Sequence, residues 1–296
     1  MPVNSNREPR DAAPAAPDTH ARIRVVQARE TSGRAPHRHA PEPVPAVAAQ
    51  NVSLVLGASP ILHDVSFSVP TGQVVALMGA NGSGKSTLVR TLLGVYRPTE
   101  GSVEILGYPQ GHPHIPFDHI GYVPQRVTPR SGVPATALEV VRSGLLSRGH
   151  LFADRGRKAK AKALAALTAV GLDERAHDHV HVFSGGQAQR LAIARALVRN
   201  PAVLFLDEPL AGVDVHSRTA LAQILSKLKR DGVTQLIVLH ETEELTPLLD
   251  RVIYLENGQV IYDGTPVELP RALEWRHAAH HRDPLVQHHA PKLTGE

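Results

Sequence analysis

The chain has 296 residues, of which 42% are hydrophobic, and this suffices for a packed globular core. It contains no cysteine, which excludes disulfides and thiolate metal sites, and its net charge of +4 is too diffuse to predict nucleic-acid binding. No apolar run of about eighteen residues predicts a transmembrane helix, and residues 1–10 are too polar for a secretory signal. We therefore expect a cytoplasmic protein with no nucleic-acid partner.

The sequence changes character near residue 46. Residues 1–45 are rich in proline, alanine and arginine and lack apolar periodicity, so they predict a disordered arm. The alternating residues 65–69 predict a strand, and the short apolar run 73–78 predicts a strand buried on both faces. A glycine-rich loop follows, and residues 85–93 predict a helix.

The rest of the chain alternates between predicted helices and strands, which favours an α/β fold with a mostly parallel core sheet. Residues of about 126–182 predict an inserted helical subdomain, and the His-rich residues 271–296 predict a flexible tail. We predict helices at 135–146, 157–170, 187–199 and 217–229, strands at 203–206 and 235–239, and a hairpin at 251–262 that turns at Asn257-Gly258.

The glycine-rich loop lies between a predicted strand and a predicted helix and fits the pattern G-x-x-x-x-G-K-[ST] in full. Glycines let backbone N–H groups turn toward an anion, and the following helix adds the positive end of its dipole. The loop therefore predicts a nucleoside-triphosphate site, in which Lys85 reaches the phosphates and Ser86 ligates Mg²⁺. The residues assigned to nucleotide binding in this loop are Gly79, Ala80, Asn81, Gly82, Ser83, Gly84, Lys85, Ser86 and Thr87.

Two carboxylates, Asp207 and Glu208, follow the apolar run 203–206. Successive side chains of a strand point to opposite faces, so the two carboxylates need not have the same role. We predict that Asp207 holds Mg²⁺, directly or through water, as the acidic residue does in phosphate-loop NTPases. The alternative is an acidic strand end that is merely solvated, but the apolar residues before it and Pro209 after it argue against this.

Phe183-Ser184-Gly185-Gly186-Gln187 places a small hydroxyl residue and two glycines at the start of a predicted helix, which again suits an anion. At this point the sequence resembles the ABC ATPase family, whose signature is usually Leu-Ser-Gly-Gly-Gln, with Phe183 in place of the leucine. The resemblance implies the phosphate-loop ABC ATPase fold over residues 46–270, with an antiparallel β subdomain beside the core sheet and with ATP and Mg²⁺ as ligands. It further implies a head-to-tail dimer of two copies, in which Ser184, Gly185, Gly186 and Gln187 close over the γ-phosphate bound to the partner subunit.

Four more residues resemble family motifs in the expected order. Glu208 resembles the general base that polarises the attacking water, and His240 resembles the switch histidine at the γ-phosphate. Gln125, in Gly121-Tyr122-Val123-Pro124-Gln125, resembles the glutamine that contacts Mg²⁺ or the water, and Asp214 resembles the acidic residue of the loop that crosses the dimer interface. Taken singly, Gln125, Asp214 and His240 would be a surface amide, a turn residue and a structural histidine; their order favours function.

The adenine side departs from the family pattern. The family usually has an aromatic residue that stacks on adenine, whereas the matching position here is Leu56, and no Phe, Tyr or Trp occurs between Asn51 and Asp64. Stacking on an aromatic side chain contributes roughly 1–3 kcal/mol per base. Leu56 offers only apolar contact, so we expect weaker discrimination between ATP and GTP than in aromatic-bearing relatives.

The resemblance implies a transport function. The stretches 121–126, 137–144 and 208–214 look most like zinc/manganese-type metal importers, so the expected partners are integral-membrane permease subunits and an extracytoplasmic substrate-binding protein, with this subunit peripheral on the cytoplasmic face of the membrane. An ABC transporter ATPase for another substrate is the first alternative. A non-transport ABC ATPase of DNA repair is the second, but such proteins need a long coiled-coil insertion that this sequence lacks. A catalytically dead module is the third, and the intact Lys85, Glu208 and His240 argue against it.

Histidines form two clusters that could bind metal. His277 and His281, at i, i+4 spacing in the tail, could share a helix face and bind Zn²⁺. The simpler interpretation is a set of solvated loops with biased composition, and we favour it. The two clusters are His277, His280, His281, His288 and His289 in the tail, and His177, His179 and His181 before the signature.

Overall fold

A six-stranded sheet forms the centre of the fold, with strand order β10-β9-β3-β8-β7-β6. The computed structural model describes residues 44–125, 134–147, 151–240 and 244–270, all within one compact unit, Pro43–Glu296. The inner strands are parallel, and β10 pairs with β9 in antiparallel fashion. The strands are β3 (Val74–Met78), β6 (Ile120–Val123), β7 (Val203–Asp207), β8 (Thr234–Val238), β9 (Arg251–Glu256) and β10 (Gln259–Gly264).

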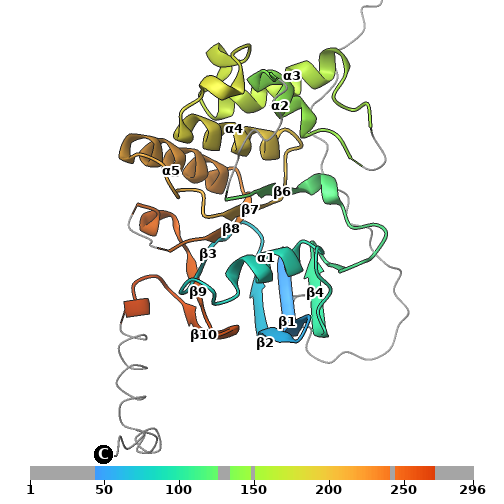
Figure 1. The fold of residues 1–296 in the computed structure, drawn as a ribbon, viewed down its shortest axis with the longest axis vertical. Helices are drawn as coiled ribbons and strands as arrows, with labels where there is room; N and C mark the ends of the chain where they lie inside the picture. Colours follow the sequence, from blue (N-terminus) through green and yellow to red (C-terminus); the bar gives the residue numbers. More distant parts are fainter. Residues whose placement is uncertain (1–43, 126–133, 148–150, 241–243, 271–296) are drawn as a thin grey trace, which may run out of the picture. The chain divides into compact units, whose positions relative to one another are not determined.

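A second, antiparallel sheet has the order β2-β1-β4-β5. The antiparallel subdomain implied by the family resemblance is therefore present, and the described fold is an α/β fold with a mostly parallel core sheet, as predicted. In Figure 1 helix α1 lies between this sheet and the six-stranded sheet. The elements are β1 (Val47–Leu56), β2 (Ser59–Val69), β4 (Glu100–Ile105), β5 (Tyr108–Pro109) and α1 (Lys85–Leu92).

Helices cover the opposite face of the six-stranded sheet (Figure 1). α4 and α5 lie next to the strands, and α2 and α3 lie on the far side of α4 from the sheet. The helices are α2 (Ala137–Ser143), α3 (Gly156–Ala169), α4 (Gly185–Leu197) and α5 (Val215–Arg230), and short 3-10 turns cover Phe117–His119, Asp173–Arg175, Val180–Val182 and Thr246–Leu248. None of the helices in the described ranges is both long and apolar enough to cross a membrane.

The six-stranded sheet has a hydrophobic core on each of its two faces. Every residue of β3, β7 and β8 is buried, and because successive side chains face opposite sides, these strands contribute to both cores. Phe205 packs with α1 and the antiparallel sheet, whereas Leu204 and Leu206 pack with the helices. Asp207, two residues after Phe205, therefore lies on the α1 side of the sheet. The alternation thus directs the Mg²⁺ candidate toward the phosphate loop.

Most predicted elements are present, with shifted ends. The predicted helix 187–199 is α4, which begins at Gly185 because Ser184 caps it, and the predicted helix 135–146 shortens to Ala137–Ser143 after the capping residue Thr136. β1 was not predicted. Its alternation is interrupted by register shifts between Ala49 and Val55, and Asn51 has a positive φ of 50°, which indicates bulged backbone.

Candidate active site

The phosphate loop joins β3 to α1 through residues 79–84, and its backbone requires glycine. Gly79, Gly82 and Gly84 have φ values of 143°, 80° and 103°. A Cβ atom on Gly79 would lie 2.0 Å from the carbonyl oxygen of Leu255, so no side chain fits there. No side chain caps the start of α1, so its first backbone N–H groups remain available to an anion.

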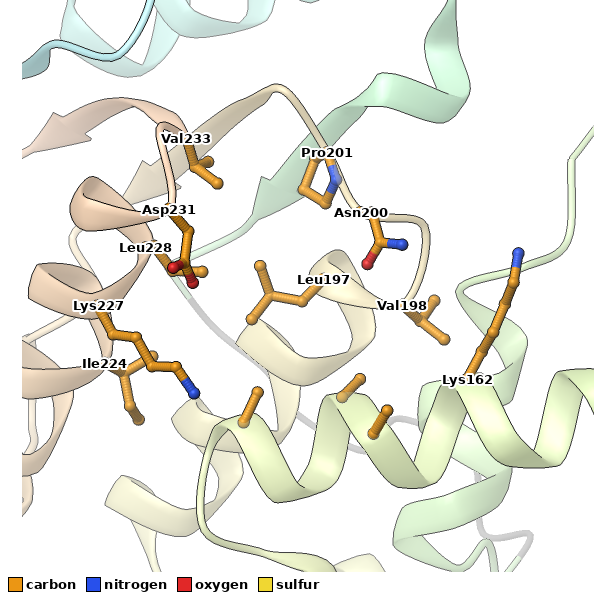
Figure 2. A pocket seen from close by; sticks show the side chains of 13 residues that line it. Lys162, Leu197, Val198, Asn200, Pro201, Ile224, Lys227, Leu228, Asp231 and Val233 are labelled. Carbon is orange, nitrogen blue, oxygen red and sulfur yellow. The ribbon is translucent and has the colours of Figure 1, made fainter. Parts of the chain in front are cut away.

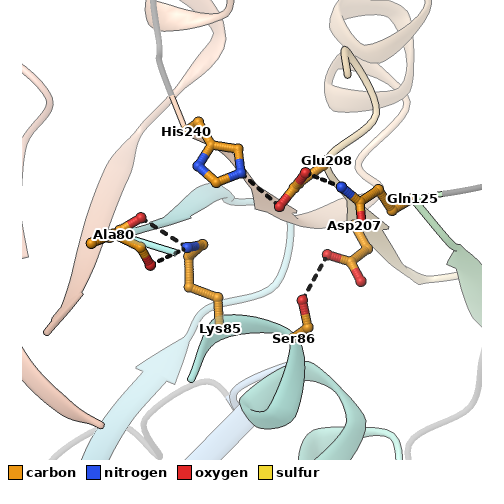
Figure 3. A network of polar contacts seen from close by, with 8 residues as sticks. Ala80, Lys85, Ser86, Gln125, Asp207, Glu208 and His240 are labelled. Atoms are coloured by element: carbon orange, nitrogen blue, oxygen red, sulfur yellow. Dashed lines mark hydrogen bonds and ion pairs between the residues drawn. The ribbon is translucent and has the colours of Figure 1, made fainter. Parts of the chain in front are cut away.

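Lys85 is buried beneath this loop, and its ammonium group lies against it. Nζ donates hydrogen bonds of 2.8 Å to the carbonyl oxygens of Gly79 and Ala80, as Figure 3 shows. Burial lowers the pKa of Lys85, while the charges of Glu208 and Asp207 oppose that shift. Ser83 adds a buried hydroxyl oxygen that has no hydrogen-bond partner among the described residues. A loop with a buried ammonium group and a buried hydroxyl that has no described partner fits the phosphates of a nucleotide.

Ser86 and Asp207 meet below the loop. The Ser86 hydroxyl donates to Asp207 Oδ1 at 3.4 Å, and Asp207 is only 5% exposed. Burial, and then the charge of Glu208, raises the pKa of Asp207. A hydroxyl oxygen next to a poorly solvated carboxylate fits Mg²⁺, whose charge would favour the ionised form of Asp207.

Glu208 is the centre of the polar network in Figure 3. Its Oε1 lies 2.8 Å from His240 Nε2, and its Oε2 accepts a hydrogen bond from Gln125 Nε2. Its backbone has a positive φ of 49°, and its N–H donates to the Val238 carbonyl at 3.1 Å. A left-handed conformation costs a non-glycine residue about 1–2 kcal/mol. The structure thus brings together the three residues predicted to be catalytic, with Glu208 in an unfavourable backbone conformation.

The signature residues lie at the start of α4. Ser184 Oγ accepts from the Gln187 N–H at 3.3 Å, and Gln187 Oε1 accepts from the Ser184 N–H at 3.0 Å, so the two form a capping box. A Cβ on Gly186 would lie 2.2 Å from Ser217 Oγ, and one on Gly185 would lie 3.5 Å from the Gly212 carbonyl oxygen. No hydrogen bond among the described residues joins Ser184–Gln187 to the phosphate loop, so the two sequence motifs do not meet through such bonds within one chain.

Asp214 caps α5 in a similar way. Its Oδ1 accepts from the Ser217 N–H at 3.0 Å, and this hydrogen bond lowers the pKa of the carboxyl group. Asp214 therefore holds the residues just before α5 in a fixed conformation. These residues also adjoin the signature, because Gly212 lies against Gly185.

Two residues near the site were missed by the sequence analysis. Tyr122 lies close to Asp207, and burial followed by the Asp207 charge raises the pKa of Tyr122. Arg218 Nε donates to the Val213 carbonyl at 2.9 Å, and its Nη1 pairs with Glu244 at 2.9 Å. Strand periodicity could have identified Tyr122. This residue of β6 pairs with Phe205 of β7, so its side chain lies on the same face of the sheet as Asp207. No sequence signal marked the Arg218 contacts.

Leu56 ends β1 opposite Ser59 in the hairpin with β2. This hairpin adjoins the phosphate loop, since a Cβ on Gly84 would lie 3.3 Å from the Ile61 carbonyl oxygen. Leu56 is partly buried against the core on the α1 side. Its proposed contact with adenine stays a prediction.

The polar site is separate from a more apolar cavity of about 450 Å³ (Figure 2). That cavity lies between α3, the end of α4 and α5, and its lining includes Leu197, Ile224 and Leu228. None of the predicted nucleotide or catalytic residues lines it. Glu208 and His240 instead line a cleft of about 120 Å³ with Arg218 and Glu244.

The histidines within the described ranges give no support to a metal sensor. The rings of His179 and His181 stack with their centroids 5.6 Å apart. Within the ranges that the structure describes, no group of three or more His, Cys, Asp or Glu side chains could hold a metal ion. His277, His281 and the other tail histidines lie outside the described residues, as do residues 1–43 of the arm predicted over 1–45.

Comparison with known proteins identifies the family. The family model for ABC transporters matches residues 62–211. The manganese transport system ATP-binding protein MntB of Bacillus subtilis (strain 168) is 36% identical over 74% of this chain and 86% of its own. The zinc uptake system ATP-binding protein ZurA of Listeria monocytogenes is 37% identical over 75% of this chain and 86% of its own. The aliphatic sulfonates import ATP-binding protein SsuB 3 of Pseudomonas syringae pv. tomato is 38% identical over 76% of this chain and 78% of its own.

Solved structures agree with this assignment. An ATP-binding cassette described as a dimer in a post-hydrolysis state with ADP and phosphate has 31% identity and a TM-score of 0.62, covering 74% of this chain and 98% of that one. A nucleotide-free ATP-binding cassette from an ABC transporter has a TM-score of 0.70 at 25% identity, covering 84% of this chain and all of that one. The family match includes the phosphate loop, the signature and both strand-end carboxylates. This chain therefore belongs to the ABC transporter family and is one of its ATP-binding ATPase subunits.

Proposed function

We propose that this ATPase subunit drives a membrane permease by hydrolysing ATP with Glu208 as general base. The observation that carries the proposal is the convergence of His240 and Gln125 on the Glu208 carboxylate, on the same strand end as Asp207. The two contacts fix the orientation of both carboxylate oxygens of Glu208. Lys85 lies at the phosphate loop, on the other side of the site. This is an arrangement for activating water beside a triphosphate.

Different residues have different roles in hydrolysis. Lys85 and the loop N–H groups bind the phosphate oxygens, while Ser86, Asp207 and Gln125 would hold Mg²⁺. When bound, Mg²⁺ neutralises charge on the β- and γ-phosphates. Glu208 accepts the proton of the attacking water, and His240 and Gln125 keep its carboxylate in place.

The signature residues act across a dimer in this proposal. Ser184 and Gln187 cap α4 in their own chain and make no described hydrogen bond to their own phosphate loop. A head-to-tail pair of subunits would bring the signature of each onto the nucleotide of the other. The similar cassette that was solved as a dimer with ADP and phosphate supports this arrangement.

We further propose a divalent metal such as manganese or zinc as the cargo, because two similar proteins carry these substrates in their names. A sulfonate is the second candidate, since a sulfonate importer subunit is equally similar in sequence. The partners would be permease subunits and an extracytoplasmic substrate-binding protein, with this subunit on the cytoplasmic face of the membrane. ATPase activity of the reconstituted transporter should rise with Mn²⁺ or Zn²⁺ and its binding protein; stimulation by an alkanesulfonate alone would reassign the cargo.

The test of the catalytic assignment is Glu208→Gln. Glutamine keeps the shape of the side chain but cannot accept the proton, so hydrolysis should fall by at least about 100-fold, while ATP binding persists. Glu174→Gln removes an exposed carboxylate outside the network and serves as the matched control. A Glu208→Gln protein that hydrolyses ATP at the normal rate would remove Glu208 as the base.

A further inference from the structure

Two large apolar side chains are exposed just before α3. Leu151 is 68% exposed and Phe152 is 67% exposed. The guanidinium of Arg155 lies over the Phe152 ring, 4.6 Å from its centroid. Isolated exposed apolar side chains are ordinary on protein surfaces, but Leu151 and Phe152 are adjacent and lie beside a group of cations.

A group of cations continues from these residues along α3. Their side chains are exposed, whereas the other face of the helix, with Ala163 and Leu167, is buried. The first turn of α3 contains no acidic residue, although cations are unfavourable at the positive end of a helix dipole. The cations are Arg155, Arg157, Lys158, Lys160 and Lys162. Across the described residues, no carboxylate forms an ion pair with any of them.

Neither the fold nor the catalytic network accounts for this combination. The patch lies along α3 and just before its start, on the far side of α4 from the sheet, and the polar contacts of the active site include none of its residues (Figures 1 and 3). A solvated helix face would explain the lysines alone. It would not explain a phenylalanine and a leucine exposed beside them.

We propose that this basic–apolar patch, which consists of Leu151, Phe152 and the five cations, contacts the anionic phospholipid surface of the membrane. Lipid headgroups attract clustered lysines and arginines at about 1 kcal/mol each, and the interface below them accepts Phe and Leu side chains. A bilayer needs no fixed partner geometry, which suits flexible lysines spread over a whole helix face. The inference extends the proposed function, because it gives a peripheral transport subunit its own contact with lipid.

Vesicle binding tests the proposal without a permease. The full chain should sediment with vesicles of phosphatidylcholine plus phosphatidylglycerol, should not sediment with phosphatidylcholine alone, and should be released by salt. The double variant Lys158→Gln/Lys160→Gln should bind the anionic vesicles about 30-fold more weakly, which corresponds to about 1 kcal/mol for each lysine. Phe152→Ser should weaken binding while its salt dependence remains.

The matched control removes the same charge from α5. Lys227→Gln/Arg230→Gln should bind vesicles like the unchanged protein, although the total charge equals that of the α3 variant. Equal binding by the α3 variant and the unchanged protein would overturn the proposal. So would normal vesicle binding by the α3 variant together with lost binding to detergent-purified permease, because the patch would then be a protein contact. Glu208→Gln should still bind vesicles, so a failure of the catalytic assignment is distinguishable from a failure of the lipid contact.

Discussion

Some residues of the candidate active site occupy positions where the backbone conformation or the available space excludes most other residue types. Glu208 adopts a left-handed backbone, and its side chain then meets His240 and Gln125. Gly79 is more restricted still, because its missing Cβ makes room for the Leu255 carbonyl. Both residues were predicted from motif position alone. The pattern gave their identity, but the reason for each conformation lies in β8 and β9, which are distant in the sequence.

Gly79→Ala should destabilise the protein and abolish ATP binding. The new methyl group would lie 2.0 Å from the Leu255 carbonyl oxygen, and we expect a loss of about 3 kcal/mol in the free energy of unfolding. Gly82→Ala is the control, since its Cβ would meet nothing within 4 Å and only its φ of 80° is unfavourable, at about 1 kcal/mol. Urea unfolding of both variants measures the difference; equal losses would show that the contact with Leu255 is unimportant.

Tyr122→Phe should weaken Mg²⁺ binding more than it slows turnover. The lost hydroxyl lies close to Asp207, and a polar interaction of about 1 kcal/mol between them corresponds to a rise of about fivefold in the Mg²⁺ concentration at half-maximal rate. Titrating Mg²⁺ at saturating ATP separates this concentration from kcat. Tyr108→Phe, in the antiparallel sheet, is the control. An unchanged Mg²⁺ titration would show that Tyr122 does not position Asp207.

Helix ends are the elements that the sequence predicts best, because their signals are local. Ser184 and Gln187 form a capping box that fixes the start of α4, while their contact with a phosphate stays a prediction. The hairpin at Asn257-Gly258 is confirmed, with φ values of 48° and 76° that suit a tight turn. β1 could not be predicted in this way. Its shifted register depends on pairing with both β2 and β4, and no local pattern records those contacts.

The capping box of α2 predicts a pH dependence of stability. The Thr136 N–H and hydroxyl both donate to Glu139 at 2.8 Å, and these bonds lower the pKa of Glu139 in the folded state. A lowered folded pKa stabilises the protein above the unfolded value of about 4.3, and the gain is lost as pH falls through the folded pKa. Glu139→Gln should therefore cost about 0.5 kcal/mol at pH 7, because exposure screens the charge.

Urea unfolding as a function of pH checks this prediction. The difference between Glu139→Gln and the unchanged protein should disappear below the folded pKa of Glu139. Glu174→Gln, at an exposed residue in a 3-10 turn, should show no comparable change. A stability difference that persists in acid would mean that the shape of the cap, and not its charge, stabilises α2.

At the scale of the whole molecule, the described chain contains the two motifs that we propose to form an ATP site, but no hydrogen bond among the described residues joins them. The phosphate loop lies between the two sheets at α1, and the signature lies at the start of α4 on the opposite face of the six-stranded sheet (Figure 1). Sequence order alone could not decide whether these motifs form one pocket within a chain. The hydrogen bonds of Ser184 and Gln187 are with each other, so we expect the exposed surface of Ser184 to contact a second subunit.

Mixing two inactive variants tests that arrangement. Lys85→Gln disables the phosphate loop, and Ser184→Asp keeps a capping side chain but places a negative charge against the γ-phosphate. In a head-to-tail heterodimer, the intact loop of one subunit meets the intact signature of the other, so an equal mixture should recover up to about a quarter of normal ATPase activity. Each variant alone should stay inactive, because its homodimer has a defect in both sites. A site built within one chain would give no recovery at any mixing ratio, since every chain would keep its own defect.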